Sequence, residues 1–263
     1  MKNIKLTLSY DGTDFAGWQS QPGRRTVQET LEKAIAAVVQ QPVRCNVSGR
    51  TDAGVHALGQ VVNFYTSTRL TATQLMRAIN AHLPPDVVVR FAEEMPQAFD
   101  ANRDARGKWY RYYVHVGSVR PIFLRRYVWH VPWRLDLEKM QRASRVLLGR
   151  HDFRSFETEW PNRMSSVRNI TYISWHQAGR MIWLDIAADG FLYNMVRAIV
   201  GTVVNVGRGY WPVEQVAKIL EARDRRQAGP TAPPQGLFLM RVYYGNEEPD
   251  LARDSQFPFA FAD

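Results

Sequence analysis

The sequence has few cysteines and no long apolar runs, which excludes several classes of protein. Its 263 residues include a single cysteine, Cys45, so no disulfide can form within the chain and no thiolate cluster can bind a metal. The first residues lack the apolar core of a signal peptide, and no apolar run reaches the roughly 20 residues that span a bilayer. We therefore expect a cytoplasmic protein without a membrane segment.

Motifs for phosphate-loop, hydrolytic and metal chemistry are also missing. Gly49 and Gly54 have the spacing of a nucleotide-binding loop, but Val55-His56 stands where lysine and serine or threonine are needed. No G-x-S-x-G sequence supports a serine hydrolase. The histidines are scattered, with no pair at helical ligand spacing: His56, His82, His115, His130, His151 and His176. We expect no metal site.

What the chain has in excess is positive charge. Lysine and arginine number 34 against 25 aspartates and glutamates, which gives a formal net charge of +9 and a pI near 9.8. Such an excess favours a polyanionic partner, nucleic acid before membrane. A soluble protein that is merely basic remains the alternative.

The periodicity of apolar residues predicts two halves with the same order of elements. Strands are expected at 4–10, 43–47, 60–65 and 87–91, and again at 110–116, 170–175, 181–187 and 237–243. Helices are expected after the capping residues Thr26, Thr71 and Asp136, and at 193–206 and 213–222. The basic, irregular stretch 99–108 suggests a boundary that gives domains 1–104 and 105–263. We expect an α+β fold whose two similar halves join their strands into one extended, mainly antiparallel sheet flanked by helices, with an active-site cleft between the halves.

The loop 48–57 concentrates the chemistry of the chain. Asp52 lies there beside Arg50, and a nearby guanidinium favours the ionised carboxylate. An ionised aspartate suits a nucleophile or the stabiliser of a developing cation. The alternative is a turn aspartate that bonds its own backbone, which is common in a Thr-Asp-Ala-Gly context.

Arg197 interrupts an otherwise apolar helical stretch. A buried guanidinium without a partner is costly, so the sequence predicts a facing carboxylate, with Asp52, Asp185 and Asp189 as candidates. Alternatively, Arg197 shares a narrow polar stripe with Asn194 and extends to solvent.

The run Tyr110-Arg111-Tyr112-Tyr113 interleaves aromatic and basic residues on a strand. Alternation places Tyr110 and Tyr112 on one face and Arg111 with Tyr113 on the other. Such a surface can stack bases and hold phosphates, although an aromatic strand more often packs on a helix, and we favour packing for Tyr112.

These residues carry a resemblance to a known family. Gly49-Arg50-Thr51-Asp52-Ala53-Gly54-Val55-His56-Ala57 resembles the signature of the tRNA pseudouridine synthase A family. The stretches 108–112 and 191–201 resemble two further blocks, and the opening 10–19, the helix start 26–28 and the segment 231–237 also fit. The resemblance runs from about Leu6 to Tyr243, and the loop 157–169 does not match residue by residue.

The resemblance implies an isomerase that converts uridine to pseudouridine in the anticodon stem-loop of tRNA, at one or more of the tRNA positions 38, 39 and 40, without a cofactor. It also implies a homodimer that grips the tRNA across both subunits. In this reading Asp52 is the nucleophile, Arg197 pairs with it, Arg50 helps hold the flipped base, and Tyr110 packs on that base.

The expected tRNA contacts are basic residues outside these blocks or at their edges. They are Arg24, Arg25, Arg103, Arg106, Lys108, Arg163, Arg168, Arg223, Arg225 and Arg226. Two alternatives stay open: a pseudouridine synthase that acts on another RNA, and a catalytically silent RNA-binding module.

Overall fold

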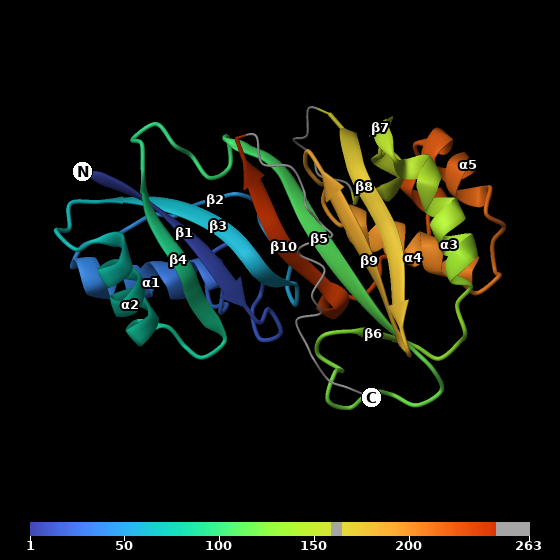
Figure 1. The fold of residues 1–263 in the computed structure, drawn as a ribbon, viewed down its shortest axis with the longest axis horizontal. Coiled ribbons are helices and arrows are strands. Elements are labelled where there is room, and N and C mark those ends of the chain that lie inside the picture. Colours follow the sequence, from blue (N-terminus) through green and yellow to red (C-terminus); the bar gives the residue numbers. More distant parts are fainter. Residues whose placement is uncertain (159–164, 246–263) are drawn as a thin grey trace. The chain divides into compact units, whose positions relative to one another are not determined.

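The computed structural model describes residues 1–158 and 165–245 (Figure 1). Backbone contacts divide the chain into two units. The first comprises Met1–Ala105 with Pro233–Val242, and the second Arg106–Ala232 with the described residues from Tyr243 onward. The first unit thus includes a segment from near the end of the chain.

The first unit is built on strands in the order β4-β1-β3-β10, with β2 paired to β3. Their bounds are Lys2–Tyr10 for β1, Asn46–Val47 for β2, His56–Thr66 for β3, Val87–Met95 for β4 and Leu237–Tyr244 for β10. β1 is antiparallel to both β3 and β4, whereas β10 is parallel to β3. Ile4, Leu6 and Leu8 alternate with less buried residues on β1 and are fully buried, so the expected alternation of this strand is confirmed.

Two amphipathic helices accompany these strands, α1 (Val27–Val39) and α2 (Ala72–His82). The Thr26 side chain accepts a hydrogen bond from the Glu29 N–H at the start of α1. Thr71 and Gln74 form a complete capping box on α2, since each side chain accepts from the other residue's backbone N–H. Both helix starts agree with the sequence, but the strand expected at 43–47 is wrong in its first part, because only Asn46–Val47 pairs.

The second unit has strands in the order β5-β9-β8-β7, with β6 parallel to β5. Their bounds are Ala105–Val116 for β5, Trp129–Val131 for β6, Gly149–Asp152 for β7, Val167–Ala178 for β8 and Met181–Ala188 for β9. The hairpin of β8 and β9, expected from the two apolar runs, is confirmed, whereas β6 and β7 were not expected.

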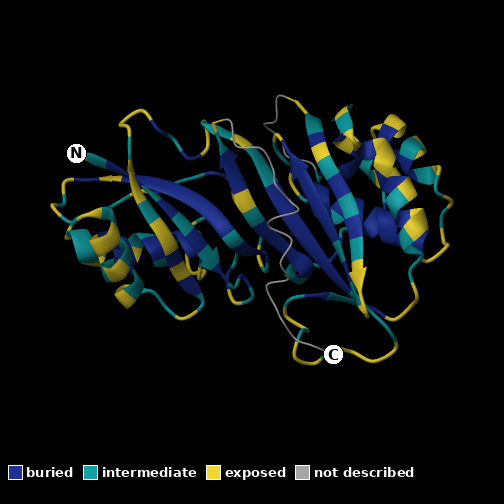
Figure 2. Ribbon diagram, in the orientation of Figure 1, coloured by how far each residue is buried: buried dark blue, intermediate teal, exposed yellow. Residues whose placement is uncertain are grey.

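Three helices pack together in this unit: α3 (Leu137–Ser144), α4 (Met195–Gly207) and α5 (Gln215–Ala222) (Figure 1). Asp136 caps α3 by accepting from the Lys139 N–H at 3.0 Å. Every residue of α4 is buried except Arg197, which is half-buried, so α4 forms the centre of this unit (Figure 2).

The expected fold class is confirmed. Over the described residues, ten strands belong to a mixed, mainly antiparallel sheet accompanied by five α-helices. None of the helices in those residues has the length and apolar character that crossing a membrane requires.

Candidate active site

The Asp52 loop, residues 48–55, connects β2 to β3 and is held by backbone hydrogen bonds on both sides of Asp52. The carbonyl of Thr51 accepts from the Trp18 N–H at 3.0 Å, and the carbonyl of Asp52 accepts from the Val55 N–H at 3.2 Å. Thr51 is buried, Asp52 is half-buried and Arg50 is exposed. Asp52 is therefore a half-buried residue on a backbone that these hydrogen bonds hold in place.

Two glycines bring a neighbouring loop directly against this one. A Cβ on Gly12 would lie 2.0 Å from the carbonyl oxygen of Val55, and a Cβ on Gly17 would lie 2.9 Å from the carbonyl oxygen of Thr51. Gly17 also has φ of +96°, a conformation that residues with a Cβ rarely adopt. The Asp-Gly…Gly-Trp spacing in 11–18 is thus a packing requirement of the Asp52 loop.

A buried network of polar side chains lies beneath the loop. The hydroxyls of Tyr10 and Thr51 are 2.8 Å apart, and Gln60 Nε2 donates to the Tyr10 hydroxyl at 3.3 Å and to the Gly49 carbonyl at 2.9 Å. Burial raises the pKa of Tyr10 to about 12, so the phenol stays protonated at neutral pH. Sequence reasoning missed Tyr10 and Gln60; a polar Gln60 at an inward position of an apolar strand was the available signal.

His56 joins the loop to the strand that follows. Its ring is buried and stacks on Phe238 of β10, with ring centroids 4.6 Å apart. The Gly12 N–H donates to His56 Nδ1 at 3.0 Å. These contacts give His56 a role in holding the loop and β10 together.

Arg197 lies near the start of α4, the helix expected around it. Its Nε donates to the Ala232 carbonyl at 2.7 Å, and its Nη1 donates to Asn194 Oδ1 at 2.7 Å. The polar stripe shared with Asn194 is therefore real. The pairing of Arg197 with Asp52 stays a prediction.

Asp185, one of the acids considered as a partner for Arg197, has a different partner. Its carboxylate accepts from Arg111 Nε at 2.7 Å, from Arg111 Nη2 at 2.9 Å and from Trp109 Nε1 at 2.8 Å. Arg111 is fully buried and Asp185 is 3% exposed. This pair uses both carboxylate oxygens, so the suggestion of Asp185 for Arg197 is wrong. Arg111 is accordingly a buried, paired residue in this structure.

Tyr110 lies on the opposite face of β5 from Arg111. Its ring meets Phe191 edge to face, with centroids 5.0 Å apart, and it is 8% exposed. Tyr112 on the same face is completely buried, and its ring meets that of Trp129 on β6 edge to face, with centroids 6.4 Å apart. Burial raises the pKa of Tyr112 well above its usual value.

Several of the expected tRNA contacts already bind protein groups. Arg25 forms two hydrogen bonds with Asp86, at 2.7 and 2.9 Å, and its guanidinium lies 4.0 Å from the centroid of the Phe15 ring. Arg225 donates to the Gly229 carbonyl and the Thr231 hydroxyl, both at 2.9 Å. Arg25 and Arg225 therefore hold surface loops in place.

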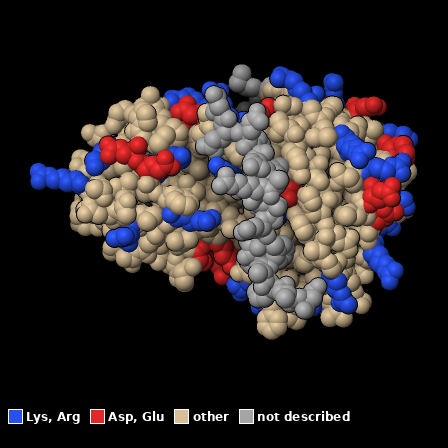
Figure 3. Space-filling model, viewed as in Figure 1, with Lys and Arg blue, Asp and Glu red and all other residues tan. Residues whose placement is uncertain are grey.

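Other expected contacts remain on the surface. Ion pairs join Arg103 to Asp104, Arg226 to Asp224 and, at 3.7 Å, Arg223 to Asp152. Arg24 and Arg106 are exposed, and Arg163 lies outside the described residues. In the view of Figure 3, lysines and arginines occupy several separate groups, with acidic side chains beside some of them.

Lys108 and Arg168 are close enough to influence each other. Burial, and to a lesser extent repulsion from Arg168, lowers the pKa of Lys108 to about 8. Arg168 lies beside Gly190, whose Cβ would be 3.5 Å from the Arg168 Nε. Lys108 shares the Tyr110 face of β5 by strand alternation, so positive charge adjoins the ring proposed to meet the base.

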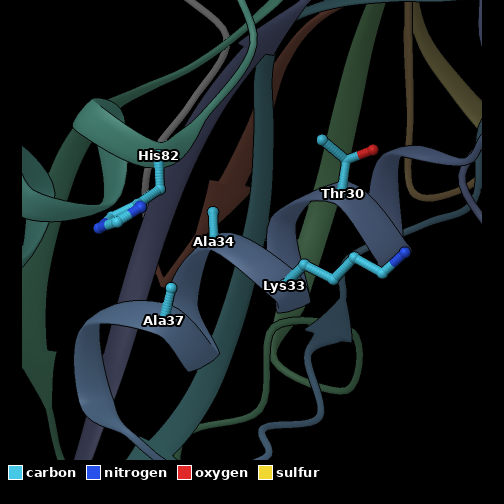
Figure 4. A pocket seen from close by; sticks show the side chains of 5 residues that line it. All are labelled: Thr30, Lys33, Ala34, Ala37 and His82. Carbon is cyan, nitrogen blue, oxygen red and sulfur yellow. The ribbon is translucent and has the colours of Figure 1, made fainter.

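A separate hollow lies between the two helices of the first unit. It has a volume of about 280 Å³ and is lined by Thr30, Lys33, Ala34, Ala37 and His82 (Figure 4). None of the residues expected in the active site borders it.

Comparison with known proteins supports the motif assignments across the chain. A family model described as tRNA pseudouridine synthase matches residues 7–102 and 143–245. The tRNA pseudouridine synthase A of Acetivibrio thermocellus is 43% identical over 244 residues, covering 93% of this chain and 100% of that protein. Those of Geobacillus sp. strain WCH70 and Geobacter sulfurreducens are 45% and 44% identical, each over 93% of this chain and 99% and 100% of those proteins.

Among solved structures, a chain of a Cbf5-Nop10-Gar1 complex aligns with a TM-score of 0.35 and 11% identity, covering 89% of this chain and 57% of that one. The resemblance seen in the sequence motifs is confirmed by the family model and the curated relatives. The chain belongs to the tRNA pseudouridine synthase family, a family of isomerases.

Proposed function

We propose that this enzyme isomerises uridine to pseudouridine in the anticodon stem-loop of tRNA, at one or more of the tRNA positions 38, 39 and 40, with Asp52 as the nucleophile. The observation that carries the assignment to Asp52 is its setting. The backbone of Thr51 and Asp52 is fixed by hydrogen bonds at 3.0 and 3.2 Å, while Asp52 as a residue is only half-buried. A reacting group needs this combination of fixed position and access.

The reaction needs a carboxylate close to the target nucleotide and no group from outside the substrate. The bond from uracil N1 to the ribose C1′ breaks, the base turns, and a bond from C5 to C1′ forms while C5 loses a proton and N1 gains one. A carboxylate attacking the sugar or the base forms a covalent intermediate with that one fragment, while the other fragment stays in the site without a covalent bond until the C5–C1′ bond forms. The group transferred is part of the substrate itself, so the proposal includes no cofactor.

Three further side chains have proposed roles. Tyr110, packed edge to face on Phe191, meets the face of the target base, and Arg50, exposed beside Asp52 in the chain, holds the base out of its stack. Removing a base from its stack costs about a few kcal/mol, which aromatic and cationic contacts offset. Arg197 pairs with the Asp52 carboxylate and favours its ionised form.

The proposal includes a homodimer in the cytoplasm, with tRNA bound across both subunits. The net charge of +9 supports a polyanionic substrate. Of the basic residues considered, Arg24, Arg106 and Lys108 are the ones we propose as contacts to phosphate. Arg25, Arg168 and Arg225 are left out because their guanidinium groups already donate to protein groups.

The test compares Asp52→Asn with Asp14→Asn, an exposed aspartate of the same unit. Transcripts of tRNA carrying a single uridine labelled with tritium at C5 release tritium when the C5–H bond breaks. We expect Asp52→Asn to release none above background and Asp14→Asn to match the parent protein. Release by Asp52→Asn would refute the assignment of the nucleophile.

The same assay tests the substrate. A parent protein that releases no tritium from uridines at these anticodon-arm positions, but does so from other sites or from another RNA, would refute the proposed specificity. A parent protein that binds tRNA and releases tritium from no RNA would indicate a silent binding module.

A further inference from the structure

Four polar side chains lie buried together under the Asp52 loop. Ser48 and Gln60 are 0% exposed, Tyr10 is 5% exposed and Thr51 is 7% exposed. Buried polar groups are costly unless each is hydrogen-bonded, and apolar residues of similar size would fill this space without that requirement. The network therefore calls for an explanation other than packing.

The contacts of Gln60 fix the direction of the hydrogen bonds. Its Oε1 accepts from the Val61 N–H at 3.1 Å, and its Nε2 donates to the Gly49 carbonyl at 2.9 Å. A backbone N–H can only donate and a carbonyl can only accept, so the amide has one possible orientation. Ser48 Oγ then donates to Gln60 Oε1, at 2.7 Å.

This orientation sets the proton positions along the rest of the network. Gln60 Nε2 donates to the Tyr10 hydroxyl at 3.3 Å, so the acceptor available to the phenolic proton is Thr51 Oγ1 at 2.8 Å. The chain of donors thus runs from Gln60 through Tyr10 to Thr51, the residue that precedes Asp52. Thr51 is held at two points, its hydroxyl by Tyr10 and its carbonyl by the Trp18 N–H.

We propose that Gln60 and Tyr10 are positioning residues for the isomerisation. The directed chain from Gln60 through Tyr10 to Thr51 fixes the backbone that carries Asp52, so that the carboxylate meets the uridine in one orientation. Neither residue touches the substrate. The inference rests on the proposed role of Asp52 as the nucleophile.

We expect loss of the Tyr10 hydroxyl to lower the rate of isomerisation and to leave the affinity for tRNA unchanged. Without the Tyr10 hydroxyl, Thr51 Oγ1 loses its buried partner, and the residue that precedes Asp52 keeps the bond from the Trp18 N–H to its carbonyl. A displacement of about 1 Å in a reacting group can cost about 100-fold in rate. The tRNA contacts proposed above lie on other side chains, so affinity for tRNA is preserved.

The experiment measures kcat, KM for tRNA and the melting temperature of full-length variants. We expect Tyr10→Phe to lower kcat about tenfold or more, with KM within about twofold of the parent value. Tyr65→Phe is the matched control, because it removes a tyrosine hydroxyl of the same unit whose partner, the Gln97 carbonyl at 3.0 Å, lies outside the loop. Thr51→Val is expected to behave like Tyr10→Phe, and Thr51→Ser, which keeps the hydroxyl, to recover most of kcat.

Two results would overturn the inference. In the first, Tyr10→Phe and Thr51→Val keep kcat within about twofold of the parent while the melting temperature falls, which would make the network purely structural. In the second, Thr51→Ser is as slow as Thr51→Val. An inactive Asp52→Asn with an unaffected Tyr10→Phe refutes only the positioning role, whereas an active Asp52→Asn refutes the site on which it rests.

Discussion

Gly17 offers a direct test of how closely the Asp52 loop must be packed. The change Gly17→Ala adds a Cβ that would lie 2.9 Å from the Thr51 carbonyl oxygen and 3.2 Å from the Asp52 carbonyl carbon. Contacts this short force the backbone around Asp52 to move. Gly23→Ala is the matched control, since Gly23 also has positive φ, +69°, but nothing lies within 4 Å of its Cβ position.

Both variants place an alanine at a positive φ, but only Gly17→Ala also brings a Cβ against the Asp52 loop. Forcing an alanine into a positive-φ conformation costs about 1–2 kcal/mol in both. At about 2–4 °C per kcal/mol, this lowers the melting temperature by about 2–8 °C. Only Gly17→Ala also displaces the loop, and a shift of about half the 1 Å that costs 100-fold corresponds to about a tenfold loss of kcat.

The assay is tritium release under saturating tRNA, measured beside thermal unfolding followed by circular dichroism. We expect Gly23→Ala to unfold earlier than the parent but to keep kcat within about twofold, and Gly17→Ala to lose activity well beyond its loss of stability. Equal kcat values for the two variants would show that close contact between the loops does not position Asp52, and the reasoning would be refuted.

Three further changes test other parts of the structure. Asp185→Ala leaves the Arg111 guanidinium buried without its carboxylate. We expect it to lower the free energy of unfolding, measured by urea titration, by about 3–5 kcal/mol. A loss below about 1 kcal/mol would contradict a tightly buried pair. Because the pKa of Lys108 is lowered to about 8, its positive charge is lost as pH rises through about 8, and tRNA affinity should fall there. Lys108→Arg should keep affinity to higher pH, and identical pH profiles would rule out this contact. Arg197→Ala, which removes bonds to backbone and side chain at the start of α4, should reduce turnover far more than Arg226→Ala on the surface, and equal turnover would contradict a role for Arg197 beside the nucleophile.

Local signals in the sequence predicted most of the elements. The capping residues Thr71 and Asp136 are bonded as their positions indicate, and the apolar period of α4 is visible in the sequence itself. Short strands are different, because β6 and β7 have only three and four residues and are defined by their partners rather than by their own alternation. Their existence depends on tertiary pairing that a single segment does not encode.

The candidate site shows the same division. The sequence motif around Asp52 identifies this residue as a candidate. Gly12 and Gly17 are also part of a sequence pattern, but their close contact with the backbone of the Asp52 loop is visible only in the structure. The sequence could not predict which distant charged residues pair with each other. Asp185 pairs with Arg111, which lies 74 residues earlier in the chain, and not with Arg197. The network of Tyr10 and Gln60 depends on the register between β1 and β3, in which side chains 50 residues apart come into hydrogen-bonding distance.

The pairing of β10 with β3 makes the surroundings of the Asp52 loop depend on a segment that is synthesised late. Phe238 stacks on His56, and Pro234 lies beside Gly54, with its Cγ 3.1 Å from where a Cβ of Gly54 would be. The Asp52 loop is therefore synthesised well before the residues of β10 that contact it, and until β10 pairs, the edge of β3 at His56 and Ala57 is open. A ribosome that stops before Pro233 releases a chain with Asp52 but without the strand that closes its surroundings. The Asp52 loop therefore reaches its full set of contacts only in a chain that has been translated through β10.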